Sequence, residues 1–217
     1  MSYSIVLFDF DGTLCDSAEG IIQGMSLTFE AQGLPRPTPE AVRAVIGLRI
    51  EECFQRLCPE LAPDDIPGWI AVYREEYFSR GHLLNRLFPG VVEILADLKR
   101  RGVIVGVASN KGQPGLERAV ENLGIAGYCD VLAGARPDLP RKPEAAFYDS
   151  CVAPSLPGAD PGQILMVGDT PTDLRFAVNV GMPACYAAWG YGNREECLSL
   201  RPRHVSDSPL ALAGIWK

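Results

Sequence analysis

The fold is decided by a stretch near the N-terminus, Ile5-Val6-Leu7-Phe8-Asp9-Phe10-Asp11-Gly12-Thr13. Its first four residues form a short apolar run with β-branched members, which is typical of a strand buried on both faces in a parallel sheet. The run stops at two acids that are two residues apart, so an extended backbone sends both carboxylates to the same side. The sequence therefore predicts a buried parallel strand that delivers a pair of acids at its carboxyl end.

Similar apolar runs recur along the chain and alternate with segments of helical periodicity. The strand-like runs lie at residues 103–108, 131–133, 164–167 and 184–188, with a short one at His204-Val205. Three segments between them carry apolar residues on one helical face and end at a glycine, namely 91–102, 116–124 and 174–181. Strands and helices that alternate in this way predict βαβ units. We therefore predict an α/β fold with a Rossmann-like, doubly wound parallel sheet.

Residues 16–84 break this rhythm and contain no strand-like run. Apolar residues at helical spacing occur instead at 21–29, 41–46, 50–57 and 66–78, and Asp16 or Ser17 is placed to cap the first of these helices. The strand and helix alternation resumes near residue 88. We therefore predict two domains: residues 1–15 and 85–217 form the α/β core, and residues 16–84 form a small α-helical cap domain inserted after the first strand.

Composition narrows the class of protein. The 217 residues are 47% hydrophobic and 22% charged, with a net charge of −7. The acidic balance argues against nucleic acid and anionic membranes as partners, and no apolar run approaches the roughly 18 residues of a membrane span. The N-terminus has no basic segment before its apolar stretch, and the seven cysteines are scattered without a CxxC pair. We expect no secretory signal, reduced thiols and a cytoplasmic location.

Polar residues follow four of the predicted strands, at the edge where parallel sheets bind ligands. Besides the acids after the first strand, they are Ser109-Asn110-Lys111, Arg141-Lys142-Pro143 and Gly168-Asp169-Thr170-Pro171-Thr172-Asp173. If a helix starts after Asp169, Asp173 lies one turn further on and faces the same site. Four carboxylates packed closely repel one another unless they are protonated or bind a cation. Mg²⁺ fits such oxygen ligands, and acids, a metal, a lysine and a hydroxyl together indicate phosphoryl transfer.

In their order and spacing, these motifs resemble the haloacid dehalogenase-like hydrolase superfamily. The likeness rests on residues 9–13, Asp16-Ser17, Ser109-Asn110, Lys142-Pro143, residues 168–173 and Trp189-Gly190-Tyr191-Gly192. The chain is most similar in layout to the phosphoglycolate-phosphatase-like members, which carry a helical cap after the first strand. The resemblance implies phosphate ester hydrolysis through an aspartyl-phosphate, with Mg²⁺ as the cofactor.

The resemblance implies a role for each matching acid. Asp9 is expected to be the nucleophile, and Asp11 is expected to be the general acid and base. Mg²⁺ would be held by the Asp9 carboxylate, the Asp11 backbone carbonyl and Asp169. Asp173 would orient metal-bound waters or ligate more weakly.

The remaining matches concern phosphate binding and the approach to the site. Ser109, with Asn110 beside it, is expected to bind a phosphoryl oxygen, and Lys142 to neutralise charge on Asp9 and the phosphoryl group. Gly12 and Thr13 would shape the turn that lets the cap open and close.

Three further features keep two interpretations each. Arg49, in a loop where this type of cap faces the substrate, binds a carboxylate or a second phosphate through its fork, or is a surface arginine. Trp189-Gly190-Tyr191-Gly192 serves loop packing more readily than substrate contact. Cys15, close to the predicted site, is a small buried hydrophobe or an oxidation-sensitive thiol.

We therefore predict a Mg²⁺-dependent phosphatase that acts on a small phosphorylated metabolite, with phosphoglycolate as the leading candidate by resemblance alone. Asp11 favours phosphate ester hydrolysis, because dehalogenase-type and phosphonate-cleaving relatives lack an acid at this position. Two alternatives stay open: a phosphomutase of the β-phosphoglucomutase-like type, and a non-catalytic sensor of phosphorylated metabolites. We expect a small-molecule partner, no nucleic acid and no membrane, and a monomer or homodimer.

Overall fold

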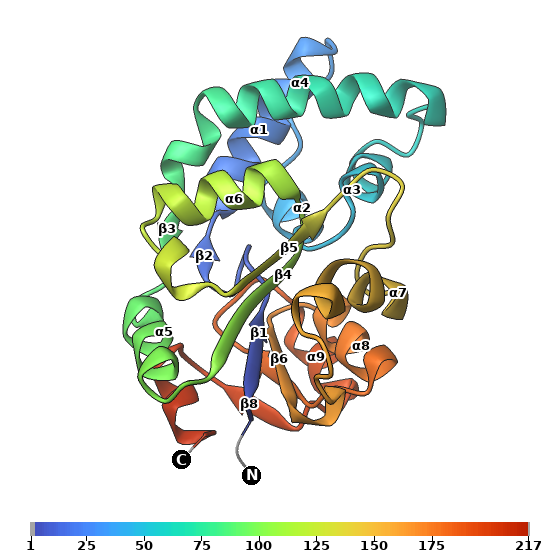
Figure 1. Ribbon diagram of the computed structural model, residues 1–217. Helices are drawn as coiled ribbons and strands as arrows, with labels where there is room; N and C mark the ends of the chain where they lie inside the picture. The colour runs from blue at the N-terminus through green and yellow to red at the C-terminus, as the bar shows by residue number, and fades with distance from the viewer. Residues whose placement is uncertain (1–2, 217) are drawn as a thin grey trace.

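The computed structural model describes residues 3–216 and has a sheet-based part with a helical part above it (Figure 1). The sheet has six parallel strands in the order β5-β4-β1-β6-β7-β8. The strands are β1 (Ile5–Phe8), β4 (Ile104–Gly112), β5 (Val131–Ala135), β6 (Ile164–Gly168), β7 (Ala184–Ala187) and β8 (His204–Ser206). This is the strand order of a doubly wound Rossmann-like sheet. The predicted fold class is confirmed.

Alternate residues of each strand pack against helices on opposite faces of the sheet. In β1, Val6 and Phe8 join one hydrophobic cluster, whereas Ile5 and Leu7 join the other. The first face is covered by α5 (Val91–Arg100), α6 (Gln113–Asn122) and the 3-10 helix η7 (Leu210–Gly214). The second is covered by α7 (Ala145–Phe147), the π-helical turn η4 (Tyr148–Val152), α8 (Pro171–Val180) and α9 (Arg194–Ser199). Because both faces are covered, the strands read as continuous apolar runs.

One strand differs from its prediction in a way that matters for the site. The sequence placed the end of the second core strand at residue 108, but β4 continues to Gly112, with a shift of register against β5 between Ala108 and Gly112. Ser109, Asn110 and Lys111 therefore lie in the irregular end of a strand. This position fixes their backbone more firmly than a free loop would.

The helical part lies above the carboxyl ends of the strands (Figure 1). Its elements are α1 (Ala18–Ala31), α2 (Pro39–Arg43), α3 (Ile50–Leu57), the 3-10 helix η1 (Pro63–Asp65), α4 (Ile66–Ser79) and the 3-10 helix η2 (Gly81–Leu84). It has its own hydrophobic cluster, in which the Trp69 ring meets Phe29 and Phe54 edge to face, with centroids 5.0 and 5.5 Å apart. We refer to this part as the cap.

A short antiparallel ribbon joins the cap to the sheet. It pairs β2 (Cys15–Asp16) with β3 (Arg86–Leu87), so the chain leaves and re-enters the core side by side. The predicted domain junctions, between residues 15 and 16 and between 84 and 85, lie in or next to this ribbon. Within residues 3–216, each helix is too short or too polar to cross a membrane.

Local structure differs from prediction at three other places. Ser17 occupies the N-cap position of α1 but makes no side-chain capping hydrogen bond, because its hydroxyl donates to Asp11 instead. The helix predicted at 41–46 begins earlier, at Pro39, where the Thr38 side chain caps it, and ends at Arg43. Short helices that were not predicted are η1, η2, α7, η4, α9, η7, η3 (Ala126–Tyr128), η5 (Ala153–Ser155) and η6 (Pro161–Gln163).

Candidate active site

Asp9 and Lys142 form the centre of the site. Asp9 directly follows β1, and its backbone N–H donates to the Val167 carbonyl of β6 at 2.8 Å. Its buried carboxylate accepts a hydrogen bond from Lys142 Nζ at 2.8 Å, and the same ammonium donates to Asp173 Oδ1 at 2.6 Å. Lys142, which precedes a cis peptide bond to Pro143, is 1% exposed. The structure thus brings three of the predicted site residues together from loops that follow different strands.

Asp169, the next acid, follows β6, and each of its two carboxylate oxygens accepts a hydrogen bond from a different residue. Thr13 Oγ1 donates to its Oδ1 at 2.8 Å, and the Tyr191 backbone N–H donates to its Oδ2 at 2.8 Å. Gly12 has a φ of +89°, and a Cβ at this position would lie 2.3 Å from Asp169 Oδ2. Only glycine tolerates both the backbone conformation and this close approach. Gly12 and Thr13, predicted to shape the turn, therefore also position Asp169.

Asp173 has protein partners for both of its oxygens. Its Oδ2 accepts from the Thr170 backbone N–H at 3.0 Å and from Thr170 Oγ1 at 2.7 Å, which makes a capping box at the start of α8. Its Oδ1 accepts from Lys142. Ligand oxygens of Asp9, Asp169 and Asp173 all lie within 4.8 Å of one another.

The charge balance of this acidic cluster fits a divalent cation. Burial and the charge of Asp173 raise the pKa of Asp9 to about 6, in spite of Lys142. Burial and the two neighbouring acids raise the pKa of Asp169 well above its usual range. When all three carboxyl groups are ionised, the one ammonium leaves two negative charges uncompensated, and oxygen ligands of this kind suit Mg²⁺. The Asp11 carboxylate lies outside the cluster, and the metal contact of its backbone carbonyl stays a prediction.

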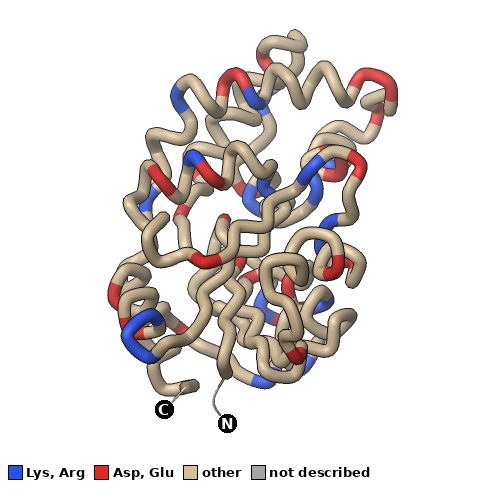
Figure 2. Tube along the Cα trace, viewed as in Figure 1, with Lys and Arg blue, Asp and Glu red and all other residues tan. Residues whose placement is uncertain are grey.

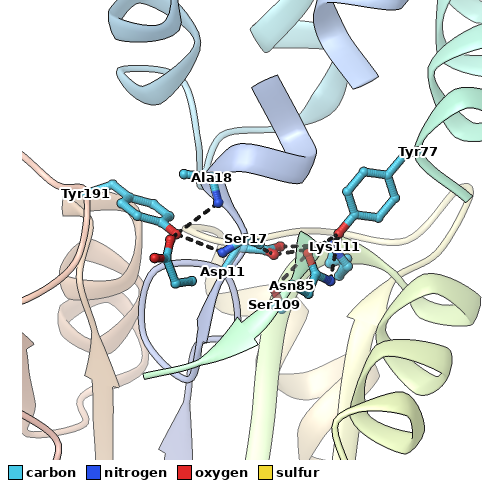
Figure 3. Close-up of polar contacts among 9 residues, drawn as sticks. Asp11, Ser17, Ala18, Tyr77, Asn85, Ser109, Lys111 and Tyr191 are labelled. Carbon is cyan, nitrogen blue, oxygen red and sulfur yellow. Dashed lines mark hydrogen bonds and ion pairs between the residues drawn. The ribbon is translucent and has the colours of Figure 1, made fainter. Parts of the chain in front are cut away.

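Asp11 lies in a different environment, at the boundary with the cap (Figure 3). Its Oδ1 accepts from Ser17 Oγ at 2.6 Å, and its two oxygens lie 3.2 and 3.3 Å from Lys111 Nζ. The Lys111 ammonium also donates to the Tyr77 hydroxyl at 3.1 Å and lies 4.6 Å from the centroid of that ring. Asn85 completes the group through hydrogen bonds with the Tyr77 hydroxyl. A chain of polar contacts therefore runs from Asp11 to helix α4 of the cap.

Lys111, Ser17 and Tyr77 were not predicted as site residues. Lys111 had one signal in the sequence, because it directly follows the Ser109-Asn110 pair at a strand end. Burial lowers the pKa of an ammonium, but here Asp11 and Tyr77 outweigh burial and raise the pKa of Lys111 well above its usual value. Lys111 is thus a permanent positive charge beside Asp11.

Ser109 and Asn110 line the cavity beside Asp9 and Asp11. Ser109 Oγ accepts from the Lys111 backbone N–H at 3.3 Å. Asn110 Nδ2 donates to the carbonyls of Gly47 in the cap, at 3.2 Å, and of Lys142, at 3.1 Å. Its buried Oδ1 has no hydrogen-bond partner in the described part of the chain. An unpaired buried acceptor is costly, so this oxygen suits a donor from substrate or water.

Of the two interpretations of Arg49, the structure favours the surface arginine. Its Nη2 pairs with Glu144 of the core, both side chains are partly exposed, and Arg49 lies outside the lining of the cavity. Glu51 makes a similar contact with Arg141 of the core, at 2.7 Å. Arg49 therefore joins cap and core through an ion pair, rather than standing in the substrate-facing position, because Glu144 lies within its reach.

The loop Trp189-Gly190-Tyr191-Gly192 packs against Asp169 and against the chain at the end of β2. The Tyr191 hydroxyl accepts from the backbone N–H groups of Ser17 and Ala18, at 2.9 and 3.1 Å, and donates to Asp16 (Figure 3). A Cβ at Gly192 would lie 1.9 Å from the Asp169 carbonyl oxygen, so the loop packs directly on that residue. These contacts agree with a packing role.

Cys15 is fully buried in β2. Burial and the nearby Asp11 carboxylate raise the pKa of its thiol far above the ordinary value. A protonated thiol shielded from solvent reacts slowly with oxidants, so the structure favours the small buried hydrophobe.

Comparison with known proteins gives the family. A family model described as haloacid dehalogenase-like hydrolase matches residues 6–187. The tyrosine-protein kinase PtkA of Mycobacterium tuberculosis is 31% identical over 194 residues, which cover 89% of this chain but only 65% of PtkA. IndB of Dickeya dadantii, named a probable phosphatase, is 32% identical over 215 residues, covering 97% of this chain and 92% of IndB.

Solved structures agree with this match. A protein from Haemophilus somnus, described as a predicted phosphoglycolate phosphatase, superposes with a TM-score of 0.89 at 25% identity, covering 100% of this chain and 99% of that one. The family model spans most of the sequence, and the sheet order and the acids at the strand ends are consistent with it. The chain belongs to the haloacid dehalogenase-like hydrolase family.

Proposed function

We propose that this protein is a Mg²⁺-dependent phosphatase that hydrolyses a small phosphomonoester through an aspartyl-phosphate on Asp9. One observation carries the proposal: two acids, two residues apart, have opposite surroundings. Asp9 is buried against Lys142, whereas Asp11 meets Ser17 and Lys111 at the edge of the cap. Carboxyl groups in such different environments suit different tasks, here attack on phosphorus and proton transfer. The names of IndB and the Haemophilus protein point to the same reaction class.

In the first step, an oxygen of the Asp9 carboxylate attacks phosphorus, and the bond from phosphorus to the ester oxygen breaks. The departing alkoxide takes a proton from Asp11. Ser109 donates to a phosphoryl oxygen, and Lys142 offsets the negative charge that Asp9 and the phosphoryl group share. Lys142 is already held 2.8 Å from Asp9, so little reorganisation is needed.

In the second step, Asp11 takes a proton from water, which attacks the phosphorus of the aspartyl-phosphate. The bond from phosphorus to the Asp9 oxygen breaks, inorganic phosphate leaves, and the carboxylate is regenerated. The Lys111 ammonium donates to Asp11 Oδ1 at 3.2 Å and so holds the carboxyl group in position for this proton transfer. Asp9, Asp169 and the Asp11 backbone carbonyl would hold Mg²⁺, and Asp173 would orient its waters or ligate more weakly. The bound Mg²⁺ would supply positive charge that reduces the repulsion between the anionic nucleophile and the phosphoryl oxygens.

The test is phosphate release from a panel of phosphorylated metabolites by the purified chain, with Mg²⁺, with EDTA, and with Asp9→Asn. We expect release from the wild-type protein with Mg²⁺ only. Undiminished release by Asp9→Asn would overturn the nucleophile, and undiminished release in EDTA would overturn the metal dependence.

Three further assays separate the alternatives. A phosphomutase would isomerise a sugar phosphate in the presence of a bisphosphate activator instead of releasing phosphate. A protein kinase, the activity named for PtkA, would transfer phosphate from ATP to a tyrosyl peptide. A sensor would bind a phosphorylated metabolite without turnover. For the phosphatase, the phosphomutase and the sensor alike, we propose a small phosphorylated molecule as the partner, and neither nucleic acid nor a membrane.

A further inference from the structure

A large cavity lies between the cap and the acids of the core. Its volume is about 660 Å³, within the range of sites that hold drug-sized molecules. The cap side of the cavity is mainly apolar and includes Ile21, Met25, Ile46, Leu48, Ile66 and Ile70. Residues 66–73 of α4 carry no charge, and this stretch of the trace is tan in Figure 2. We call the side chains of Ile21, Met25, Ile46, Leu48, Ile66 and Ile70 the apolar wall.

Aromatic rings extend the apolar wall toward the acids. The Tyr73 and Tyr77 rings stack with their centroids 5.7 Å apart and an interplanar angle of 23°, and Phe78 packs against Tyr77. All three line the cavity. Flat and aliphatic groups pack well on such surfaces, so the space above Asp9 and Asp11 suits an apolar occupant.

The charged side chains of the cavity are paired or face solvent. Lys111 donates to Asp11, and Arg141 pairs with Glu51 at 2.7 Å. Arg74 and Arg136 are exposed, where water screens their charge. Among residues 3–216, the cavity therefore offers no buried, unpaired cation to a second anionic group of a substrate.

A leaving group with its own negative charge is poorly matched to this cavity. Phosphoglycolate would release glycolate, a small carboxylate, and a buried carboxylate without a partner carries a large desolvation penalty. Arg49, for which binding of such a group was one of two interpretations, pairs with Glu144 outside the cavity. An apolar group at the same place gains from leaving water.

We propose that the leaving alcohol of the substrate is bulky, uncharged and predominantly apolar, and that it packs against the apolar wall. This inference rests on the proposed phosphatase function and narrows its substrate class, away from small anionic esters such as phosphoglycolate. The phosphoryl group remains at Asp9, and the alcohol extends into the cap.

The first test uses alkyl phosphates, because their alcohols differ in length and hardly in chemical reactivity. We expect kcat/KM with Mg²⁺ to rise about fourfold for each methylene from ethyl to hexyl phosphate, the gain for a fully buried methylene. Hexyl phosphate should exceed both phosphoglycolate and the phosphate ester of 6-hydroxyhexanoic acid, which has the same chain with a terminal carboxylate. A flat series, or a preference for either carboxylated ester, would overturn the inference.

The second test places a cation in the apolar wall. Leu48 is only partly buried, so Leu48→Lys is compatible with folding, which circular dichroism checks. The preference is the ratio of kcat/KM for hexyl phosphate to kcat/KM for the phosphate ester of 6-hydroxyhexanoic acid. We expect this ratio to fall at least tenfold in Leu48→Lys. Val178→Lys, at a position on α8 that is 63% exposed, adds the same charge away from the cavity and should keep the wild-type preference. An equal change in both variants would overturn the assignment to the wall.

Acetyl phosphate distinguishes failure of this inference from failure of the proposed function. It is reactive and needs little binding energy from its leaving group. Hydrolysis of acetyl phosphate with no preference among the alkyl esters would leave the phosphatase proposal standing and overturn the apolar substrate. No hydrolysis of the phosphate esters or of acetyl phosphate, which is a mixed anhydride, would overturn both.

Discussion

The two sides of the active-site cavity are built in different ways. On the sheet side, Asp9, Asp169, Asp173 and Lys142 are buried. Lys142 donates short hydrogen bonds to Asp9 and Asp173, and the Tyr191 backbone N–H donates one to Asp169. On the cap side, the residues that line the cavity are mostly apolar. The cap has a polar link to Asp11, which passes through Tyr77 and Lys111. The difference suggests that the sheet side carries the chemistry, which demands fixed positions, and that the cap selects the leaving group.

The physical basis of the difference is how each side is held. Asp9 and Asp169 follow the adjacent strands β1 and β6, whose ladder fixes their backbones. The cap is joined by the β2–β3 ribbon and by side-chain contacts such as Arg49 with Glu144. Breaking those contacts leaves the sheet ladder intact, so movement of the cap would cost the acidic cluster little order.

The largest expected effect lies on the sheet side. Asp9→Asn removes the proposed nucleophile, and we expect kcat to fall by at least about 10⁴-fold, as when nucleophiles are removed from other hydrolases. The fold should survive, because the amide has the same shape and removes one of three clustered negative charges. Phosphate release and thermal unfolding measure the two effects. Asp207→Asn, at a side chain that is 84% exposed, is the matched control; retention of a tenth of the activity by Asp9→Asn would contradict the prediction.

The lysines beside the two acids, Lys142 and Lys111, allow a direct comparison of the sheet side with the cap side. Lys142→Met leaves Asp9 and Asp173 facing each other without a cation, and we expect a loss of about 3–5 kcal/mol in the free energy of unfolding. Lys111→Met should cost less, because Asp11 keeps its hydrogen bond from Ser17 and is 9% exposed. Urea unfolding in EDTA, where no metal can replace the lost charge, measures both variants. A greater loss in Lys111→Met would reverse the comparison.

Metal binding should stabilise the sheet side in a pH-dependent way. Without metal, the raised pKa of Asp9, about 6, means that the folded state binds a proton more tightly than the unfolded state. The stability contributed by this proton is present below the ordinary aspartate pKa and is lost as pH rises through about 6.

At about 100 times its dissociation constant, Mg²⁺ should add about 2.7 kcal/mol at neutral pH. This increment should shrink as pH falls below about 6, because protons compete with the metal for Asp9. Thermal unfolding with and without Mg²⁺ across this range is the measurement, and Asp207→Asn should follow the wild-type curve. An increment that grows on acidification would contradict the raised pKa.

The smallest effect is expected at the polar link to the cap. Tyr77→Phe keeps the ring stack on Tyr73 but removes the hydroxyl that bonds Lys111 and Asn85. We expect KM to rise several-fold with kcat nearly unchanged, and a loss of about 1 kcal/mol in stability. Steady-state kinetics separate the two constants, with Tyr128→Phe, in η3 of the core, as the control. A fall in kcat as large as that of Asp9→Asn would make Tyr77 part of the chemistry.

Much of the core could be predicted because its signals are local. Helices α5, α6 and α8 show one apolar face and end at or near a glycine, and the buried strands show continuous apolar runs. The helical stretch that begins at Ala145 escaped prediction because it passes from α to π to 3-10 geometry within residues 145–155. A changing period leaves no regular pattern of apolar residues to detect.

By itself, the sequence determined that Asp9 and Asp11 stand together at the end of a strand and that further acids follow a later strand. Apolar runs and the spacing of neighbouring residues reveal this because they are local properties of the chain. The family resemblance also implied that Lys142 acts on Asp9, which lies 133 residues away in the sequence. Only the tertiary structure decided the other pairings, in which Arg141, next to Lys142, pairs with Glu51 of the cap. Arg49 is drawn to Glu144, and Lys111 meets Tyr77. These pairings depend on strand order and on how the cap sits over the sheet, and residue spacing along the chain encodes neither.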